Sequence, residues 1–213
     1  VYDAGVDERG QPYLVMELVN GEPILAFCSR NGLSIRERLE IFQKVGHAVQ
    51  HAHQKGIVHR DLKPSNILVA RQDGADVPKI IDFGIAKVME GSEPDLAHRT
   101  RTGQLLGTLE YMSPEQILGS PELVDTRSDV YSLGVLLYQL LTGRLPYDFG
   151  NDSIGEAARV IGSIPPRPLK ATLASRIDED LETIVFTALA KEPDRRYPGA
   201  AALAEDIGGY LAS

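Results

Sequence analysis

The chain has 213 residues, of which 43% are hydrophobic and 24% are charged, so it is long enough to bury one large core or two small ones. Its 30 acidic and 22 basic residues give a net charge of −8, which argues against nucleic acid or an anionic membrane surface as the main partner. The single cysteine, Cys28, excludes a disulfide within the chain and favours a reducing compartment, so we expect a cytoplasmic location.

No stretch of the sequence predicts a membrane-spanning helix. The longest uncharged run lies between Asp129 and Arg144, which is shorter than the ~20 apolar residues that a membrane span needs. No secretory signal pattern opens the chain. We therefore expect any membrane anchor of a longer parent protein to lie outside these residues.

The first 19 residues predict a β-hairpin. Strand-like apolar segments at 1–5 and 12–19 flank a polar turn that contains Gly10. Because an isolated two-stranded hairpin is only marginally stable, we expect this one to pack against other residues.

The rest of the chain predicts a mostly helical body. Ser34 and Glu37 have the spacing of a capping box, and apolar residues recur after them at helical intervals up to a break at Gly56. After this helix we expect two short strands, a long irregular segment and four helices, in this order: 67–69, 79–81, 82–115, 128–142, 153–161, 178–190 and 200–211.

One segment concentrates charged and polar residues in a way that neither a core strand nor a helix explains. In HRDLKPSNILV, residues 59–69, Asp61 and Asn66 are separated by five positions, and Pro64 prevents the segment from continuing as a helix. The tripeptide DFG, residues 82–84, follows the apolar end of the next predicted strand. A carboxylate before a flexible glycine suits a metal ligand on a loop that moves.

These motifs, in this order and spacing, resemble those of the protein kinases. HRDLKPSN matches their catalytic loop, and DFG matches their metal-binding motif. GTLEYMSPE (107–115) is similar to the end of their activation segment, DVYSLG (129–134) to the central helix of their large lobe, and KEPDRRY (191–197) to the segment that carries that lobe's structural arginine. The resemblance covers almost the whole chain, and it is nearest to the bacterial eukaryotic-like Ser/Thr kinases.

The resemblance implies a fold and a division of the chain. The fold would be protein-kinase-like α+β, with a mostly helical large lobe and a β-hairpin remnant of the small lobe. Residues 1–19 would belong to the small lobe and the start of the hinge. Residues 20–213 would form the large lobe with the catalytic loop, the activation segment and the late helices.

The resemblance also implies a role for each polar residue of the catalytic loop, in the transfer of the γ-phosphate of ATP to Ser/Thr hydroxyls of protein substrates. Asp61 would orient the substrate hydroxyl and accept its proton. Lys63 would offset charge on the transferred phosphate, and its position two residues after Asp61 resembles Ser/Thr rather than Tyr specificity. Asn66 and Asp82 would bind Mg²⁺ ions.

Four residues of the chain would contact the nucleotide if the resemblance holds. Met16 resembles the residue at the back of the adenine pocket, and Glu17 and Val19 bound a segment that resembles the hinge. Backbone groups of that hinge would hydrogen bond to the edge of adenine. Leu68 would form part of the floor beneath the ring.

The expected activation segment contains candidate phosphorylation sites. Phosphate on Thr102, or on Thr100 as second choice, would add roughly −1.5 to −2 units of charge. Arg60 and Lys87 are the cations expected to pair with it and so to order the segment. Thr108 would instead face the substrate, through a hydroxyl contact with the catalytic loop.

Five residues are expected to have structural roles, namely His59, Phe83, Asp129, Glu115 and Arg196. His59 and Phe83 would pack to align the catalytic loop rather than act as acid or base, and Asp129 opens the motif of the central helix. Glu115 and Arg196 would form a buried ion pair. Arg195 is the competing partner, disfavoured because Arg196 directly precedes the aromatic Tyr197, as in the family pattern.

Three histidines invite comparison with a metal site. His47 and His51 are four residues apart on the predicted helix, and His53 follows them. Acidic or cysteine partners at matching spacing are lacking, and the sequence contains no H-E-x-x-H. The sequence therefore does not predict zinc here.

Two features of a kinase are missing from residues 1–58, namely a G-x-G-x-x-G loop and a strand lysine of the V-A-I-K type. We therefore expect these residues to belong to an active parent kinase but to bind ATP weakly and transfer little phosphate by themselves. Protein substrates, and a homodimer for trans-autophosphorylation, are the partners that the resemblance implies.

Two other functions are weighed against this one. A non-catalytic, pseudokinase-like scaffold is disfavoured because the four polar residues of the catalytic and metal motifs are all present. A small-molecule phosphotransferase is disfavoured by Lys63 and by the segment 107–115, which suits a protein substrate.

Overall fold

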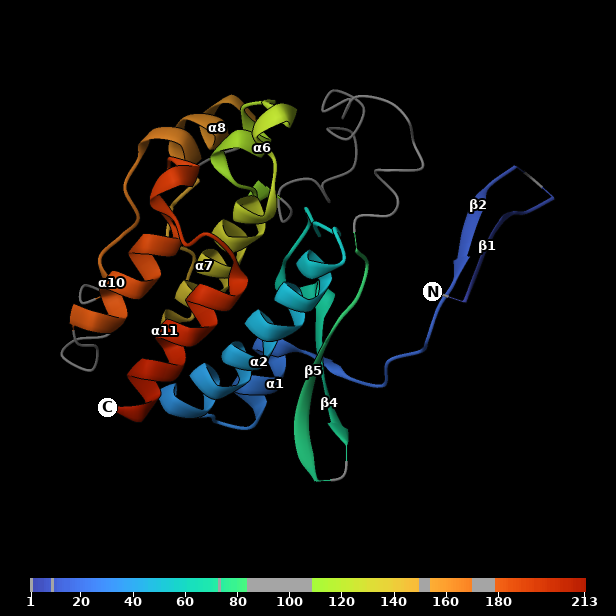
Figure 1. Cartoon of the computed structure of the whole chain (residues 1–213), viewed down its shortest axis with the longest axis horizontal. Coiled ribbons are helices and arrows are strands. Elements are labelled where there is room, and N and C mark those ends of the chain that lie inside the picture. Colours follow the sequence, from blue (N-terminus) through green and yellow to red (C-terminus); the bar gives the residue numbers. More distant parts are fainter. Residues whose placement is uncertain (1, 9, 73, 84–108, 150–153, 170–178) are drawn as a thin grey trace.

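A β-hairpin and a helical body make up the computed structural model of the chain, which describes residues 2–8, 10–72, 74–83, 109–149, 154–169 and 179–213 (Figure 1). In chain order the elements, with short 3₁₀ helices marked η, are β1 (Asp3–Val6), β2 (Pro12–Val15), β3 (Glu22–Pro23), α1 (Ile24–Arg30), α2 (Ile35–Gln54), η1 (Pro64–Asn66), β4 (Ile67–Gln72), β5 (Ala75–Ile80), α6 (Pro114–Ile117), η2 (Pro121–Leu123), α7 (Thr126–Thr142), α8 (Ile154–Ser163), α10 (Glu179–Ala188), η3 (Pro193–Arg195) and α11 (Ala200–Ala212).

The predicted N-terminal hairpin is confirmed. Strands β1 and β2 pair antiparallel, with Asp3 opposite Val15, and Figure 1 shows the hairpin to one side of the helical body. Tyr2 is 74% exposed and Leu18 is 82% exposed. Val6, Tyr13 and Val15 of the two strands are also 64%, 46% and 43% exposed, so the expected packing of the hairpin against other residues stays a prediction.

The long helix α2 begins and ends where its sequence predicts. The backbone N–H of Ser34 donates to Glu37 Oε2 at 2.8 Å, and the N–H of Glu37 donates to Ser34 Oγ at 3.3 Å, so the capping box is formed. The helix buries an apolar face that includes Leu39, Phe42 and Val45.

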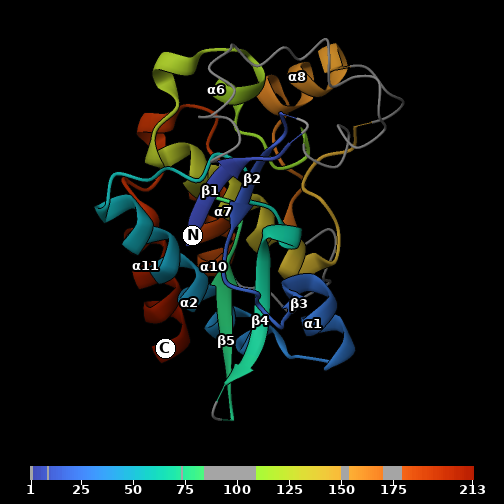
Figure 2. The same cartoon turned by 90° about the vertical axis from the view of Figure 1, so that its right-hand side faces the viewer.

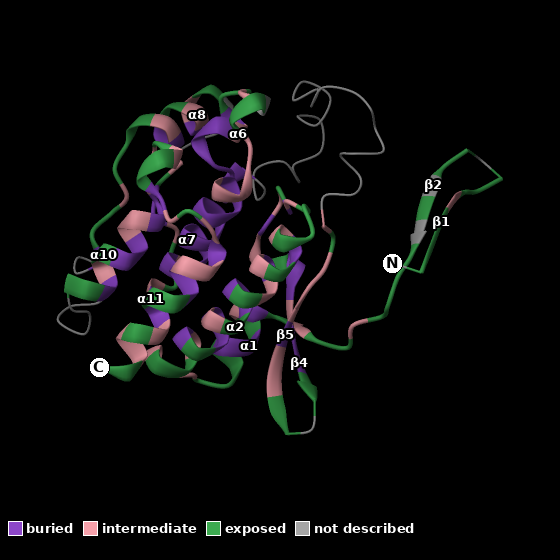
Figure 3. Cartoon of the chain, in the orientation of Figure 1, coloured by how far each residue is buried: buried purple, intermediate pink, exposed green. Residues whose placement is uncertain are grey.

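Helix α7 is the centre of the body and is buried along almost its whole length (Figure 3). Its N-terminus is capped by Asp125, whose side chain accepts the N–H of Arg127 at 2.7 Å. It ends at Gly143, which has a φ of 70° that favours glycine. A helix that is apolar on every side must be surrounded, and α2, α10 and α11 all pack against it.

Two glycines allow helices to approach closely. A Cβ on Gly134 of α7 would lie 2.9 Å from the Cβ of Ala188 in α10, and one on Gly46 of α2 would lie 2.9 Å from the Cβ of Ala204 in α11. Both distances are shorter than real Cβ contacts, so a larger residue would push the helices apart.

A small antiparallel sheet, in the order β3-β4-β5, lies beside α2 (Figure 2). Strand β4 pairs with β5 from Ile67 opposite Ile80 to Gln72 opposite Ala75, so both strands are longer than the sequence predicts. The N–H of Ile81 extends the ladder to the carbonyl of Asn66 at 2.9 Å. The two predicted polar motifs therefore meet at one end of this ladder.

Strand β3 and helix α1 are not predicted from the sequence. At seven residues, α1 is too short to show a helical period. Its apolar residues Ile24, Phe27 and Cys28 are buried, and Cys28 is 2% exposed. The lone cysteine is thus part of the packing.

The four late helices of the prediction correspond to α7, α8, α10 and α11, with ends that differ by at most two residues. Of the expected irregular segment 82–115, residues 84–108 lie outside the described residues, and α6 begins at Pro114. In the part of the chain that the structure describes, none of the helices has the length and apolar character needed to cross a membrane.

Candidate active site

The catalytic-loop motif is anchored to α7 through its backbone. The N–H of His59 donates to Asp129 Oδ2 at 2.8 Å, and the N–H of Arg60 donates to Asp129 Oδ1 at 2.9 Å. Asp129 is fully buried. Arg60 has a φ of 65°, an uncommon conformation for a residue with a side chain, and the paired hydrogen bonds to one carboxylate hold it there.

His59 connects the catalytic loop to the strand before Asp82. The N–H of Asp61 reaches His59 Nδ1 at 3.3 Å, so Nδ1 acts as the acceptor and Nε2 carries the hydrogen. Nε2 then donates to the carbonyl of Ile81 at 3.0 Å. The His59 ring lies 4.9 Å from the ring of Phe83, at an interplanar angle of 47°. The two rings thus pack against each other and link the segment that contains Asp61 to the segment that contains Asp82.

The Asp61 side chain is held by two neighbours from its own loop. Lys63 Nζ lies 3.0 Å from Asp61 Oδ2, and Asn66 Nδ2 lies 2.9 Å from the Asp61 carbonyl oxygen and 3.3 Å from Oδ2. The Asp61 side chain is 25% exposed, so a ligand can reach the carboxylate while its neighbours restrict its rotation. A carboxylate oriented in this way can accept a proton from a hydroxyl.

Asn66 and Asp82 could hold a metal ion. Asn66 is 5% exposed, and because its amide nitrogen is used by Asp61, its carbonyl Oδ1 is left to accept, with a long 3.4 Å contact from the Ser65 hydroxyl. Asp82 is exposed and has a φ of 57°, directly after the ladder that ends at Asn66. Amide and carboxylate oxygens are the donors that Mg²⁺ prefers, so this donor set fits the ion.

The structure brings only part of the expected nucleotide site together. The backbone at Gly21, just after Val19, lies so close to Leu68 that a Cβ there would be 3.0 Å from the Leu68 Cβ. Glu17 Oε1 accepts from Lys79 Nζ at 2.6 Å, which ties the expected hinge to β5. Hydrogen bonding and the charge of Lys79 lower the pKa of the Glu17 carboxyl. Met16 is 40% exposed.

Glu115 and Arg196 form a buried, bidentate ion pair. Arg196 Nη1 donates to Glu115 Oε1 at 2.7 Å, and Nη2 donates to Oε2 at 2.8 Å. The two side chains are 0% and 3% exposed. Burial raises the pKa of the Glu115 carboxyl, but hydrogen bonds from Arg196 and Ser128 outweigh it, so the pKa lies below its usual value. Arg195, the competing candidate, is exposed instead, and its Nε is 3.9 Å from Glu192 Oε2, which is a long distance for an ion pair.

Three residues that support the site were not identified from the sequence. His53 Nε2 lies 2.8 Å from Asp129 Oδ2, and its side chain is 4% exposed. Gln116 Nε2 donates to the carbonyl of Arg60 at 2.8 Å, and Ser128 Oγ donates to Glu115 Oε1 at 2.6 Å. The S-x-x-Q spacing of Ser113 and Gln116 at the start of α6 is a capping-box signal that could have identified Gln116. By contrast, no local sequence pattern links His53 to α7.

Several predicted residues are not located by the structure. Thr100, Thr102, Thr108 and Lys87 lie outside the described residues. Arg60, the other expected phosphate partner, is exposed beside the candidate site. The proposed phosphorylation sites therefore stay predictions.

A helical body in which the segment that contains Asp61 and Asn66 meets Asp82 at the end of one short ladder resembles the arrangement of a protein kinase. Residues 2–206 match the family model of the protein kinase domain. The chain belongs to the protein kinase family and is of the bacterial Hanks type.

Relatives of this chain include bacterial serine/threonine-protein kinases. Pkn1 of Myxococcus xanthus is 42% identical over 203 residues, which are 95% of this chain and 28% of that protein. PknB of Mycolicibacterium smegmatis is 37% identical over 211 residues, which are 97% of this chain and 32% of that protein. The chain thus spans about a third of the length of these relatives.

Among solved structures, the kinase domain of PknI from Mycobacterium tuberculosis, determined as a double mutant, is similar to this chain with a TM-score of 0.70 and 25% sequence identity. The similarity covers 99% of this chain and 69% of that one. The predicted kinase-like α+β fold is confirmed by this similarity.

Proposed function

We propose that this chain carries the phosphoryl-transfer site of a Ser/Thr protein kinase that uses ATP and Mg²⁺. The observation that supports this most directly is the placement of Asp61, Lys63 and Asn66 in one hydrogen-bonded group at the end of the ladder that leads to Asp82. Phosphoryl transfer depends on positioning and charge, and these residues supply both.

Each residue has a defined part in this proposal. The Asp61 carboxylate accepts the proton of a Ser/Thr hydroxyl and aims its oxygen at the phosphate, while Asn66 limits its rotation. The Lys63 ammonium, 3.0 Å from Asp61, offsets negative charge on the transferred group. Asn66 Oδ1 and the Asp82 carboxylate hold Mg²⁺, which when bound neutralises charge on the phosphates.

The nucleotide and regulatory residues follow the same proposal. Backbone groups between Glu17 and Val19 contact the adenine edge, with Met16 behind the ring and Leu68 beneath it. Phosphate on Thr102 or Thr100 orders the activation segment. Since residues 1–58 contain no glycine-rich loop and no strand lysine, we expect the 213 residues alone to transfer little phosphate.

The test measures phosphate transfer from γ-labelled ATP to a protein substrate by the full-length product of the gene that encodes these residues. Asp61→Asn is expected to lower the rate by at least ~10²-fold, with an unchanged melting temperature. Glu205→Gln, which changes an exposed carboxylate on α11, serves as the matched control. Phosphoamino-acid analysis should find phosphoserine or phosphothreonine.

A wild-type rate in the Asp61→Asn protein would refute the catalytic role of Asp61. If the wild type transfers no phosphate and the Asp61→Asn variant keeps every measured binding property, the scaffold function is favoured instead. Phosphotyrosine as the product would contradict the specificity inferred from Lys63.

A further inference from the structure

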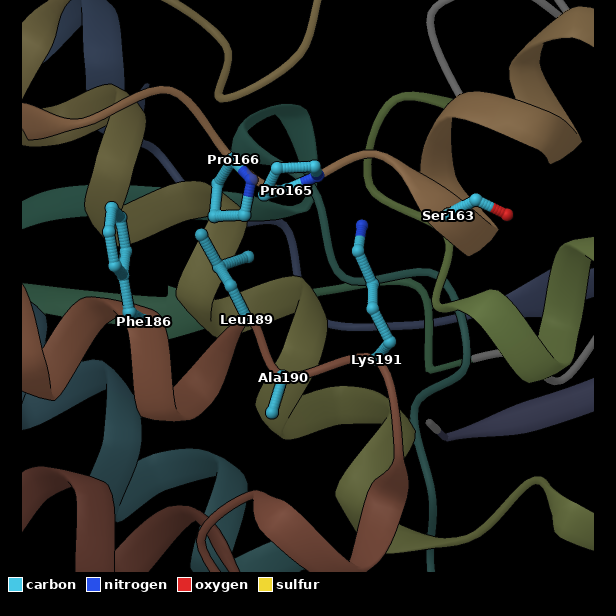
Figure 4. A pocket seen from close by; sticks show the side chains of 7 residues that line it. All are labelled: Ser163, Pro165, Pro166, Phe186, Leu189, Ala190 and Lys191. Atoms are coloured by element: carbon cyan, nitrogen blue, oxygen red, sulfur yellow. The ribbon is translucent and has the colours of Figure 1, made fainter.

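An open pocket lies between the end of α8 and the end of α10, and none of its residues belongs to the candidate active site. It has a volume of about 230 Å³ and is lined by Ser163, Pro165, Pro166, Phe186, Leu189, Ala190 and Lys191. Figure 4 shows the Lys191 side chain along one side of the pocket, with its amino group between Pro165 and Ser163 in this view. The opposite side is formed by the apolar side chains of Phe186 and Leu189.

The Lys191 ammonium is the only charged group among the pocket-lining residues. Its Nζ donates to the carbonyl of Ile161 at 2.6 Å and to Tyr147 Oη at 2.9 Å, and it lies 4.1 Å from the centre of the Tyr147 ring. An ammonium has three N–H donors, and within the described ranges no third acceptor and no carboxylate partner is found for Lys191. One donor and one positive charge are thus left for a ligand.

Among the residues that the structure describes, no negative charge is found to balance that of Lys191. The charge of Arg196 acts on Lys191, and Arg196 is itself paired with Glu115. Burial and the nearby Arg196 lower the pKa of the Lys191 ammonium to about 8. An anion bound at Nζ would relieve both effects, since an opposite charge stabilises the protonated form.

We propose that this pocket binds a small monocarboxylate, with its carboxylate on the Lys191 ammonium and a short aromatic or aliphatic body against Pro165, Pro166, Phe186 and Leu189. The single cation matches one negative charge, whereas a phosphate or a sugar would need more donors than these apolar walls supply. The pocket is smaller than the roughly 300–1,000 Å³ of sites for drug-sized ligands, so the ligand is about the size of benzoate.

The test uses benzoate as the probe, with its neutral analogue benzamide as the control for shape. Ligand-observed saturation-transfer NMR on the full-length gene product should give a dissociation constant for benzoate on the order of 1 mM. Benzamide should bind at least about tenfold more weakly, because it gains no ion pair with Lys191.

Three variants separate the pocket from other lysines. Lys191→Met should remove the preference for benzoate over benzamide, and Lys191→Arg should keep it. Lys44→Met, at an exposed lysine on α2 whose ammonium donates to the carbonyl of Asp76, should bind benzoate as the wild type does. The benzamide comparison in the wild type tests the proposal even if Lys191→Met fails to fold.

The pH dependence of binding gives a second readout. Affinity for benzoate should be nearly constant from about pH 6 to 7 and then fall about tenfold as Lys191 loses its proton around and above pH 8. The facing groups do not change charge over this range, because the pKa of Tyr147 is raised to about 12 by burial, that of Tyr131 is raised by burial, and Arg196 stays paired with Glu115.

Equal binding of benzoate and benzamide, an unchanged preference in Lys191→Met, or the absence of saturable benzoate binding would each overturn the proposal. An affinity that stays flat above pH 8 would also contradict it, because the charge at Lys191 would then not matter.

Discussion

Loss of the Arg196 side chain is expected to destabilise the helical body strongly. The guanidinium donates twice to Glu115, and it also reaches the carbonyl oxygens of Ala190 at 2.7 Å, Lys191 at 2.8 Å and Arg127 at 3.0 Å. Arg196→Ala removes all five hydrogen bonds and leaves the Glu115 carboxylate buried with only the Ser128 hydroxyl and a backbone N–H as partners among the described residues.

The size of the effect follows from that unpaired charge. Removing one partner of a buried ion pair costs about 3–5 kcal/mol, which is a large part of the roughly 5–15 kcal/mol that keeps a typical domain folded. At about 2–4 °C per kcal/mol for a domain of this size, the melting temperature should fall by about 6–20 °C. Circular dichroism during heating, together with urea unfolding, measures both quantities.

The neighbouring arginine provides the control. Arg195 is 77% exposed in its side chain and lies 3.9 Å from Glu192, so Arg195→Ala should change the free energy of unfolding by less than ~0.5 kcal/mol. The double variant Glu115→Gln with Arg196→Met should be less destabilised than the sum of the two single variants. An unchanged melting temperature in Arg196→Ala would refute the structural role of the pair.

The same pair makes a pH prediction with a definite sign. The pKa of Glu115 is lowered in the folded protein, so its stabilising contribution is present above the unfolded pKa of about 4.3 and is lost as the pH falls through the folded value. In Arg196→Ala, burial without the arginine raises this pKa, and the cost of the buried charge is relieved as the carboxyl protonates. The stability difference between wild type and variant should therefore shrink between pH 7 and pH 5.

Three further predictions concern stability. His53→Leu should lower the free energy of unfolding by about 1.5–3 kcal/mol, because a hydrogen bond to a buried carboxylate is lost, whereas His51→Leu at an exposed position of the same helix should have little effect in the same urea titration. Gly134→Ala should lower the free energy of unfolding by about 1–3 kcal/mol, because the added methyl group forces α7 away from α10. Gly209→Ala has open space at its Cβ and should stabilise α11 by about 0.5–1 kcal/mol. A higher melting temperature for Gly134→Ala than for Gly209→Ala would contradict this packing. The pKa of Lys191 is lowered to about 8 in the folded protein, so between pH 8 and about 10 the unfolded chain binds more protons than the folded chain does. The free energy of unfolding should therefore rise over this pH range, and Lys191→Met should abolish the rise.

The local signals of the sequence predicted much of the fold and of the candidate site. The capping box at Ser34, the hairpin turn and the late helices depend on residues close together in the chain, so their patterns carry the necessary information. The catalytic-loop and DFG motifs are likewise short. Helix α1 was missed because a seven-residue helix has no detectable period, and its burial depends on residues distant in sequence.

By itself, the sequence determined which residues are candidates for the chemistry and in what order they follow one another. Tertiary structure decided which of them meet. Asp129 holds the backbone of His59 and Arg60 from 70 and 69 residues away, and His53 reaches the same carboxylate from 76 residues away.

The choice between two adjacent arginines shows the same division. Both Arg195 and Arg196 suit an ion pair by residue type, but only Arg196 faces the interior, where its side chain is 0% exposed against 77% for Arg195. A charge buried in this way needs a partner, whereas one in water does not. Burial is a property of the packed helices, and a linear pattern of charges does not contain it.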